Sequence, residues 1–481
     1  MPSLSEILAN HSGKGYVIAP AGFGKTHLIA DAVKISEGRQ LILTHTHAGV
    51  DALKKKLQKL DVLSAKYHVD TIASYALKLC LSYPQTANWN IEVPSSGEEW
   101  EELCLKCTAL VGNEFIKRVL CASYEGIYVD EYQDCMQSHH NMLLAFSETL
   151  PLRILGDPLQ AIFDGIGGQN AVDWDTQLVP HFEHLGELDT PHRWIHDGDP
   201  ALGQWLRGLR GDIEVGNDID IQNGLPPSVT LRVVSNDAEL QKQQINVCKW
   251  GTQNKDGRII AIHKGDGQYK NKCHALAKLT SGFFSSIEEI EGSRLFAFVR
   301  AYDRKATAQD KLLCIIELMK EKCFSGISDA LSAATKRGEH ANIQAKTKNP
   351  EIVQAANEFL NTPSSSNLSV FIQGVKNAPE TTLYARDLFY RLLKVLTINK
   401  AEPALTLGEA ATLFQKQFRH TGRPISYPKL IGTTLLVKGQ EYDHAIVLDA
   451  SSLSKKDLYV ALTRGSKSLT IISKNRILRP T

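Results

Sequence analysis

A glycine-rich turn near the start of the chain constrains the fold more than any other feature. Residues 16–19 are expected to form a short strand, the run APAGFGKT occupies residues 19–26, and a helix is expected from about Lys25 onward. In such a strand–turn–helix unit the backbone N–H groups curl around phosphate oxygens, the lysine reaches the outer phosphates and the following hydroxyl binds Mg²⁺. The pattern therefore predicts a loop that holds the phosphates of a nucleotide and Mg²⁺. Its predicted nucleotide-binding residues are Ala21, Gly22, Phe23, Gly24, Lys25 and Thr26, with Thr26 also a metal ligand.

Short apolar runs alternate with helical stretches, which is typical of parallel α/β sheets. Further strands of a first sheet are predicted at residues 41–44, 127–130 and 154–156. A second sheet is predicted from the runs at residues 230–234, 258–263, 430–435, 445–449 and 469–472. The intervening region, residues 301–423, is helical in pattern, and its Ser/Asn/Pro stretch at 361–367 predicts a loop.

Two carboxylates, Asp130 and Glu131, follow the strand predicted at 127–130. In a phosphate-loop enzyme the first carboxylate holds Mg²⁺, and the second orients and deprotonates the attacking water. An acidic pair after a strand is by itself most often a solvated loop. Together with the glycine-rich turn, it predicts a site of nucleotide hydrolysis.

The charge of the chain is nearly balanced, with 54 Lys and Arg against 53 Asp and Glu. This balance excludes a uniformly basic surface, so a nucleic-acid site must be a local groove. The sequence has no apolar stretch long enough to cross a bilayer, and its first residues lack the pattern of a signal peptide. A cytoplasmic protein with no membrane partner is expected.

Nine cysteines, an odd number, indicate reduced thiols rather than a disulfide framework. Cys80, Cys104, Cys107 and Cys121 lie between the two nucleotide motifs and could hold zinc or an iron–sulfur cluster. The spacing of Cys104 and Cys107 also fits one face of an amphipathic helix, where cysteines are small buried apolar residues. The second interpretation is favoured.

Five blocks resemble the motifs of superfamily 1 DNA helicases of the UvrD/Rep type. The first is DEYQD at residues 130–134. The later blocks are ILGDPLQAIF at 154–163, LDTPHRW at 188–194, TTLLVKGQEYDHAIVLD at 433–449 and LYVALTRGSKSL at 458–469. Together with the glycine-rich turn they occur in the family's order and extend over nearly the whole chain.

The resemblance implies an α/β fold of two RecA-like parallel-sheet domains, with the ATP site between them and a reduced helical insertion. It assigns residues 1–190 to domain 1A, with a very small 1B insertion at about 78–122. Domain 2A would comprise residues 191–300 and 426–481, and residues 301–425 would form a 2B-like insertion.

The resemblance also implies roles for single residues. Lys25 and Glu131 would be catalytic, Gln160 would sense the γ-phosphate and couple it to DNA, and Asp130 would hold Mg²⁺. Arg193 and Arg464 would be arginine fingers on the second sheet. Lys438, Gly439 and Glu441 occupy family positions in the fifth block, and the last two are assigned to the nucleotide.

Residues 43–53 and 70–79 resemble two DNA-contacting motifs of the family. In the family a Tyr and, two residues later, a Trp follow the γ-phosphate sensor and stack on bases, but this chain has Phe163 and Gly165. The predicted contacts to single-stranded DNA are Thr44, His45, Thr46, His47, Ser74 and Phe163.

Three functions stay open. The leading one is an ATP-dependent single-stranded DNA translocase or helicase with 3′ to 5′ polarity, in bacterial DNA processing or anti-phage defence. The chain also resembles in build the helicase subunit of the Gabija defence system, which acts with a nuclease. The alternative is an ATPase subunit that senses DNA or a nucleotide and controls a partner nuclease with little unwinding of its own; the third is a phosphate-loop ATPase that does not contact DNA.

Overall fold

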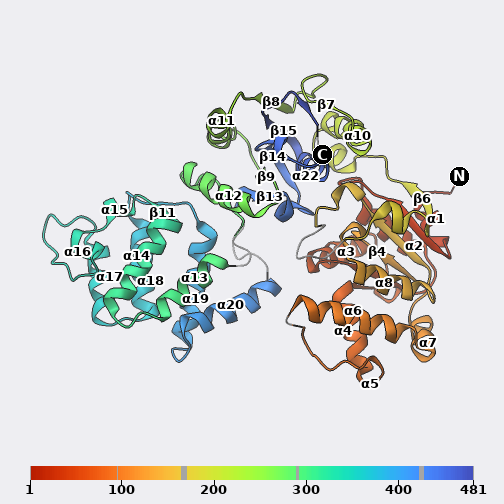
Figure 1. Cartoon of the computed structure of the whole chain (residues 1–481), viewed down its shortest axis with the longest axis horizontal. Helices are drawn as coiled ribbons and strands as arrows, with labels where there is room; N and C mark the ends of the chain where they lie inside the picture. The colour runs from red at the N-terminus through yellow and green to blue at the C-terminus, as the bar shows by residue number, and fades with distance from the viewer. Residues whose placement is uncertain (1, 95, 164–170, 289–291, 422–426, 480–481) are drawn as a thin grey trace. The chain divides into compact units, whose positions relative to one another are not determined.

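The structure is a computed structural model that describes residues 2–94, 96–163, 171–288, 292–421 and 427–479 (Figure 1). The chain folds into two compact units, which are described separately. The first comprises residues up to Ile219 together with Ser454–Lys467. The second comprises Asp220–Leu453 together with Ser468–Arg479.

The first unit contains a six-stranded sheet in the order β3-β2-β4-β5-β1-β6, with every neighbouring pair parallel. The strands are β1 Lys14–Ile18, β2 Gln40–Thr44, β3 Tyr67–Thr71, β4 Gly126–Val129, β5 Leu152–Gly156 and β6 Glu183–Glu187. The four strands predicted for this sheet are confirmed. The sequence did not indicate the edge strands β3 and β6, because polar residues interrupt both (YHVDT and EHLGE).

Helices cover both faces of this sheet. Alternate residues of β1 point to opposite sides, so Tyr16 joins one apolar cluster and Val17 joins the other. The helices of the unit are α1 Leu4–Asn10, α2 Lys25–Ile35, α3 His47–Lys59, α4 Ile72–Ser82, α5 Pro84–Ala87, α6 Gly97–Val111, α7 Glu114–Ser123, α8 Gln137–Ser147, α9 His192–Asp197, α10 Pro200–Val215 and α22 Lys455–Leu462.

Residues 78–122, expected to be a very small 1B insertion, carry helices that are part of this core. Leu103 and Leu110 of α6 are buried in the same apolar cluster as Ile127 of β4. Most of this segment is therefore a layer over the sheet of the first unit.

The second unit contains a six-stranded sheet in the order β10-β13-β9-β14-β15-β8. Its strands are β8 Val229–Val233, β9 Ile259–His263, β10 Ser285–Ser286, β13 Lys429–Thr433, β14 Tyr442–Val447 and β15 Gly465–Ser473. The pairs β10–β13, β13–β9, β9–β14 and β15–β8 are parallel. All five strands predicted for this sheet are confirmed, and so is the α/β class with two RecA-like parallel sheets. Helices α11 Asp237–Lys249 and α12 Gly267–Leu279 belong to this unit, as does α21 Thr434–Val437.

A helical body with its own apolar core interrupts the second sheet between β10 and β13. Its longer helices are α13 Ser293–Asp303, α14 Ala308–Leu318, α17 Pro350–Asn361, α18 Ser365–Asn377, α19 Arg386–Ala401 and α20 Leu407–Thr421. The shorter elements are α15 Ile327–Ala330, α16 Ala333–Lys336 and the strand pair β11 Phe324–Ser325 and β12 Thr382–Leu383. Phe359, Phe371 and Phe389 are fully buried in its core.

The predicted loop at 361–367 is wrong in its second half, because α18 begins at Ser365. The Ser364 hydroxyl accepts a hydrogen bond from the backbone N–H of Asn367 (3.1 Å) and so caps this helix. Serine favours loops and also helix N-caps, since its side chain can replace a missing backbone acceptor. The composition of the stretch therefore marked the start of a helix as well as a loop.

The boundaries of the compact units are not those expected from the resemblance, at residues 190 and 425. Helices α9 and α10, and the segment with α22, belong to the first unit although they were assigned to domain 2A. The division into 1A, 1B, 2A and 2B stays a prediction. Over the described ranges, no helix combines the length and the apolarity that a membrane span requires.

We expect Ser364→Ala to weaken the first turn of α18 by about 0.5–2 kcal/mol, because its N-cap is lost. Amide hydrogen exchange of this turn, measured by mass spectrometry, should accelerate by roughly 2- to 30-fold. Ser366→Ala, inside the same helix, is the matched control and should leave the exchange rate almost unchanged. Equal exchange in the two variants would contradict the capping role.

Candidate functional site

The glycine-rich turn between β1 and α2 adopts a conformation that only glycines take readily. Gly22 and Gly24 have φ values of +77° and +95°. Gly24 is the N-cap of α2, so no side chain caps the first turn of the helix that starts at Lys25. A helix start of this kind presents backbone N–H groups and a partial positive charge to an anion.

The side chain of Lys25 lies between the two predicted carboxylates. Its Nζ is 2.6 Å from Glu131 Oε1 and 3.4 Å from Asp130 Oδ1. Burial disfavours the ammonium, but Glu131 and Asp130 outweigh it, so the pKa of Lys25 is raised. Burial raises the pKa of Asp130 to about 6 although Lys25 opposes the shift, and the negative charge of Glu131 adds to it.

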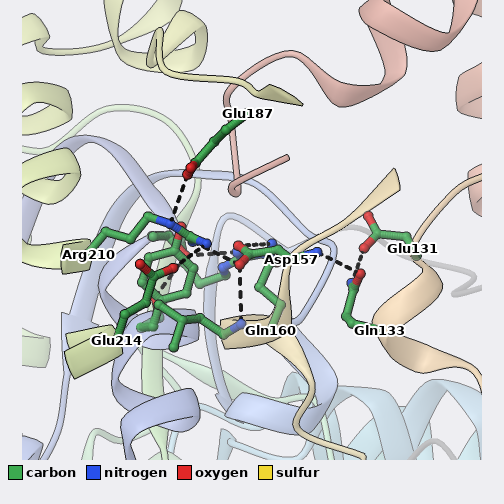
Figure 2. Close-up of polar contacts among 11 residues, drawn as sticks. Glu131, Gln133, Asp157, Gln160, Glu187, Arg210 and Glu214 are labelled. Atoms are coloured by element: carbon green, nitrogen blue, oxygen red, sulfur yellow. Dashed lines mark hydrogen bonds and ion pairs between the residues drawn. The ribbon is translucent and has the colours of Figure 1, made fainter. Parts of the chain in front are cut away.

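The backbone at Glu131 is in the left-handed region, with φ of +57°. A non-glycine residue there costs about 1–2 kcal/mol, and such strain gathers at functional sites. The turn is stabilised by the Glu131 N–H, which donates to Asp130 Oδ1 (2.9 Å). The Gln133 amide donates to Glu131 Oε2 (Figure 2). Because Lys25 contacts Oε1, both oxygens of the carboxylate are held.

The end of β5 presents the predicted γ-phosphate sensor. Asp157 is fully buried, and its Oδ2 accepts a hydrogen bond from Gln160 Nε2 (2.8 Å) (Figure 2). The Asp157 N–H donates to Gln133 Oε1 (3.0 Å). Gln133 therefore contacts both the Glu131 carboxylate and the segment that carries Gln160.

Arg193 lies directly against the glycine-rich turn. Its backbone N–H donates to the carbonyl oxygen of Gly22 (2.9 Å), and its Nη1 donates to the carbonyl oxygen of Thr463 (2.8 Å). A Cβ atom at Gly22 would stand 3.1 Å from Cζ of Arg193 and 2.8 Å from Cζ3 of Trp194. The turn, Arg193 and the segment after α22 thus form one site in the first unit.

Arg464 is fully buried at the C-terminal end of α22. Its Nε donates to the carbonyl oxygen of Val460 (2.9 Å) and its Nη2 to Thr463 Oγ1 (2.9 Å). The resemblance assigned Arg193 and Arg464 to the second sheet, whereas the structure groups both with the first unit. The physical reason is the fully buried Trp194, whose Nε1 donates to the carbonyl oxygen of Gly465 (2.9 Å).

The predicted metal ligands have the right chemistry for Mg²⁺. Thr26 is the second residue of α2, and Asp130 directly follows strand β4. A hydroxyl and a carboxylate are hard oxygen donors, which Mg²⁺ prefers, together with water and phosphate oxygens. Lys25, Asp130 and Glu131 together carry one net negative charge, which a divalent cation can neutralise. The residues therefore fit the ion.

The four cysteines singled out in the sequence do not form a metal centre. Cys80, Cys104 and Cys107 are buried and Cys121 is exposed. Throughout the described part of the chain, no group of three or more His, Cys, Asp or Glu side chains is arranged to hold a metal ion. The apolar interpretation of Cys104 and Cys107 agrees with their place in the core.

Five of the six predicted DNA contacts lie at the carboxyl ends of two paired strands, β2 and β3. Thr44 is opposite Thr71 in this pair, and Ser74 is in the first turn of the helix after Thr71. Thr46 caps α3, and both Thr46 and His47 are exposed. Of the other predicted contacts, the Thr44 side chain is buried and Phe163 is half-buried. The Nε2 atom of His45 is 3.4 Å from Cys135 Sγ. Gly165 lies outside the described residues.

Lys438, Gly439 and Glu441 belong to the second unit. They form the turn between α21 and β14, where Gly439 has φ of +72° and Glu441 is exposed. Their assignment to the nucleotide stays a prediction.

Four residues of this site were not indicated as functional by the sequence. Three are Gln133, Asp157 and Trp194, described above. The fourth is Arg210 of α10, whose Nη1 is 2.8 Å from Asp157 Oδ1. Gln133, Asp157 and Trp194 lie inside the motifs DEYQD, GDPLQ and PHRW. Their position within these motifs was the one sequence feature that could have indicated a functional role. Arg210 lies in an ordinary amphipathic helix, and nothing in its neighbours marks it.

No protein-family model matches the chain, and no curated protein matches it. Among solved structures, the chain is similar to the Arterivirus nonstructural protein 10, a helicase, in complex with DNA, at 16% identity and a TM-score of 0.28, covering 55% of this chain and 51% of that chain. The crystal structure of the same viral helicase gives 16% identity and a TM-score of 0.27, with 56% and 52% covered. The chain thus spans about half the length of these helicases. A likeness of this size does not support a role for any residue of the site, so the description of the site rests on its geometry alone.

We expect Gly22→Ala to weaken nucleotide binding by roughly tenfold or more, because an added Cβ would force the turn away from Trp194 and out of its left-handed conformation. Calorimetric titration with a non-hydrolysable ATP analogue measures this loss. Gly208→Ala in α10, where an added Cβ meets no atom within 4 Å, is the control. Unchanged affinity in the Gly22 variant would mean that this turn does not hold the phosphates.

Proposed function

We propose that the protein is an Mg²⁺-dependent ATPase that uses hydrolysis to move along single-stranded DNA, a translocase or helicase of the UvrD/Rep type. The observation that carries the proposal is the placement of the Lys25 ammonium between Glu131 and Asp130, next to a phosphate-type turn. The order of the sequence motifs supports the DNA-dependent part of the proposal.

The residues of the first unit supply the groups that phosphoryl transfer requires. The N–H groups at the start of α2 and the Lys25 ammonium would bind the phosphates, and Glu131 would orient the attacking water and accept its proton. Arg193, against the turn, would stabilise the negative charge that develops on the phosphate oxygens, an effect worth about 10³ to 10⁵ in rate in related chemistry. Mg²⁺ held by Thr26 and Asp130 would neutralise phosphate charge.

The carboxyl edge of the first sheet also supports the proposed DNA contacts. Strand β2 pairs with both β3 and β4, so the segment that starts at Thr44 lies between the one that carries Ser74 and the one that carries Asp130. Loops at the carboxyl ends of parallel strands are where open α/β sheets bind ligands. A strand of DNA bound by Thr44–His47 and Ser74 would therefore lie along the edge that binds the nucleotide. The 3′ to 5′ polarity and a place in bacterial DNA processing or anti-phage defence are proposed from the motif resemblance.

A second candidate function is an ATPase subunit that senses DNA or a nucleotide and controls a partner nuclease, as in the Gabija-type resemblance. The observation that favours it is the sequence after Gln160, where Phe163 is present but Gly165 replaces the second stacking residue. Base stacking contributes about 1–3 kcal/mol per base, so the loss of one platform weakens the grip on the strand.

We expect Lys25→Ala and Glu131→Gln to reduce ATP turnover by at least about 10²-fold while the fold is kept, because each removes a group that acts on the phosphates or the water. Steady-state ATP hydrolysis with Mg²⁺ and single-stranded DNA is the measurement, with circular dichroism as the check on folding. Lys34→Ala, an exposed lysine on the same helix, should keep wild-type turnover. Retained hydrolysis in either site variant would refute the assignment.

The two candidate functions differ in strand displacement. For a translocase, single-stranded DNA should stimulate ATP turnover at least about tenfold, and a duplex with a 3′ single-stranded tail should be separated. Stimulation without displacement would support the sensor. A wild-type protein that hydrolyses ATP equally well with and without DNA would exclude the translocase and the DNA sensor, and would leave an ATPase that senses a nucleotide or one that does not contact DNA.

A further inference from the structure

Arg210 of α10 lies inside the first unit, surrounded by acidic and hydroxyl groups. Its Nη1 is 2.8 Å from Asp157 Oδ1 and donates to the Tyr459 hydroxyl oxygen (3.0 Å). Its Nη2 is 2.7 Å from Glu214 Oε1, and its Nε is 3.7 Å from Glu187 Oε1 (Figure 2). One guanidinium therefore joins β5, β6, α10 and α22.

The contacts of Arg210 with Asp157 and Tyr459 are buried. Asp157 is 0% exposed, and both Arg210 and Tyr459 are almost fully buried. Burial opposes the charge of Arg210, but Asp157 and the other anionic groups raise its pKa, so the guanidinium stays charged. A buried carboxylate such as Asp157 needs a fixed cation, and a planar guanidinium with several donors satisfies several partners at once.

A continuous series of polar contacts connects Arg210 with the proposed hydrolytic centre. Asp157 holds Arg210 through Oδ1 and Gln160 through Oδ2. The Asp157 N–H donates to Gln133, and the Gln133 amide donates to Glu131 (Figure 2). Glu131 in turn contacts Lys25. The orientation of the Asp157 carboxylate therefore sets the position of the Gln160 amide, and Arg210 sets the orientation of Asp157.

Arg210 also connects this centre with α22. Tyr459 lies in α22, and Thr463 directly after this helix accepts a hydrogen bond from Arg193. The guanidinium of Arg210 lies 5.3 Å from the centre of the Tyr459 ring, so the two side chains are held by a cation–π contact as well. Arg210 thus contacts both Asp157, which binds Gln160, and Tyr459 of α22, the helix that precedes Thr463, to which Arg193 donates.

We propose that Arg210 is a positioning residue for DNA-coupled hydrolysis: through Asp157 it fixes Gln160, and through Tyr459 it fixes α22 relative to the nucleotide turn. This inference rests on the proposed function and deepens it. Arg210 contacts neither the phosphates nor the DNA in this assignment. Its loss therefore affects the stimulation by DNA more than nucleotide binding.

The test compares Arg210→Gln with Arg207→Gln. Arg207 is an exposed arginine on the same helix that pairs with Asp189 (3.3 Å). ATP turnover is measured with and without single-stranded DNA, and nucleotide affinity is measured separately. Arg210→Gln should reduce the stimulation by DNA at least about tenfold, with affinity for a non-hydrolysable ATP analogue within about threefold of wild type, whereas Arg207→Gln should match wild type in both.

A double-mutant cycle with Gln160→Ala separates positioning from a general loss of stability. If Arg210 acts through Asp157 and Gln160, the double variant should lose no more stimulation than the stronger single variant. Tyr459→Phe removes one hydroxyl and should reduce stimulation by about two- to fivefold, and Arg210→Lys should retain part of it because the charge is kept. If Arg210→Gln does not fold, Arg210→Lys combined with Gln160→Ala provides the same cycle.

Multiplicative losses in these cycles would overturn the proposal, and so would an equal effect of Arg207→Gln. A wild-type protein without DNA-stimulated turnover would overturn the proposed function itself. Wild-type stimulation that survives in Arg210→Gln would overturn only the role of Arg210.

Discussion

The buried ammonium of Lys25, shared by Glu131 and Asp130, is the interaction on which the rest of the site depends. Removing a charge from water costs several kcal/mol, and the attraction of a close opposite charge offsets this cost only when the geometry is good. At an effective dielectric constant of about 20, two unit charges 4 Å apart attract by about 4 kcal/mol. The left-handed turns at Gly22, Gly24 and Glu131 bring the three side chains within this range. The backbone strain at Glu131 is therefore tied to the placement of one positive charge.

A second buried ion pair joins Asp157, which follows β5, to Arg210. Here too the attraction of a close opposite charge offsets the cost of removing a charge from water. Strands β4 and β5 are adjacent, so the carboxylates that follow them lie at one edge of the sheet. Gln133 contacts both groups, since its amide nitrogen donates to Glu131 and its oxygen accepts from the Asp157 N–H. A Cβ at Gly156 would stand 2.7 Å from Gln133 Oε1, so this link requires a residue without a side chain before Asp157. Two charge clusters are thus joined by one neutral amide.

The sequence predicted what depends on local pattern, and it missed what depends on distant contacts. The apolar strands, the turn at 19–26 and the acidic pair were predicted because each has a local signature. Strands β3 and β6 were missed because polar residues interrupt both, and the start of α18 was predicted as loop because serine favours both loops and N-caps. The grouping of Arg193 and Arg464 with the first unit was not predicted, since it depends on a bond between Trp194 and Gly465 that joins residues far apart in the chain. Arg210 was missed for the same reason.

The placement of the cationic groups bears on where the proposed coupling to DNA would arise. Lys25 and Arg193 are fixed beside the nucleotide turn by bonds within one unit, and preorganised charge costs little reorganisation when a reaction occurs. Regulation would then require an element whose position can change, and the segment from Asp157 to Phe163 is a candidate because it carries the predicted sensor Gln160 and the predicted DNA contact Phe163. The buried carboxylate of Asp157 anchors it, Gln160 follows on a short 3₁₀ helix, and Phe163 is half-buried three residues further on. Because the segment is so short, a base that stacked on Phe163 would act on the Gln160 amide directly, and the bond to Asp157 would determine how much of that displacement reaches Glu131.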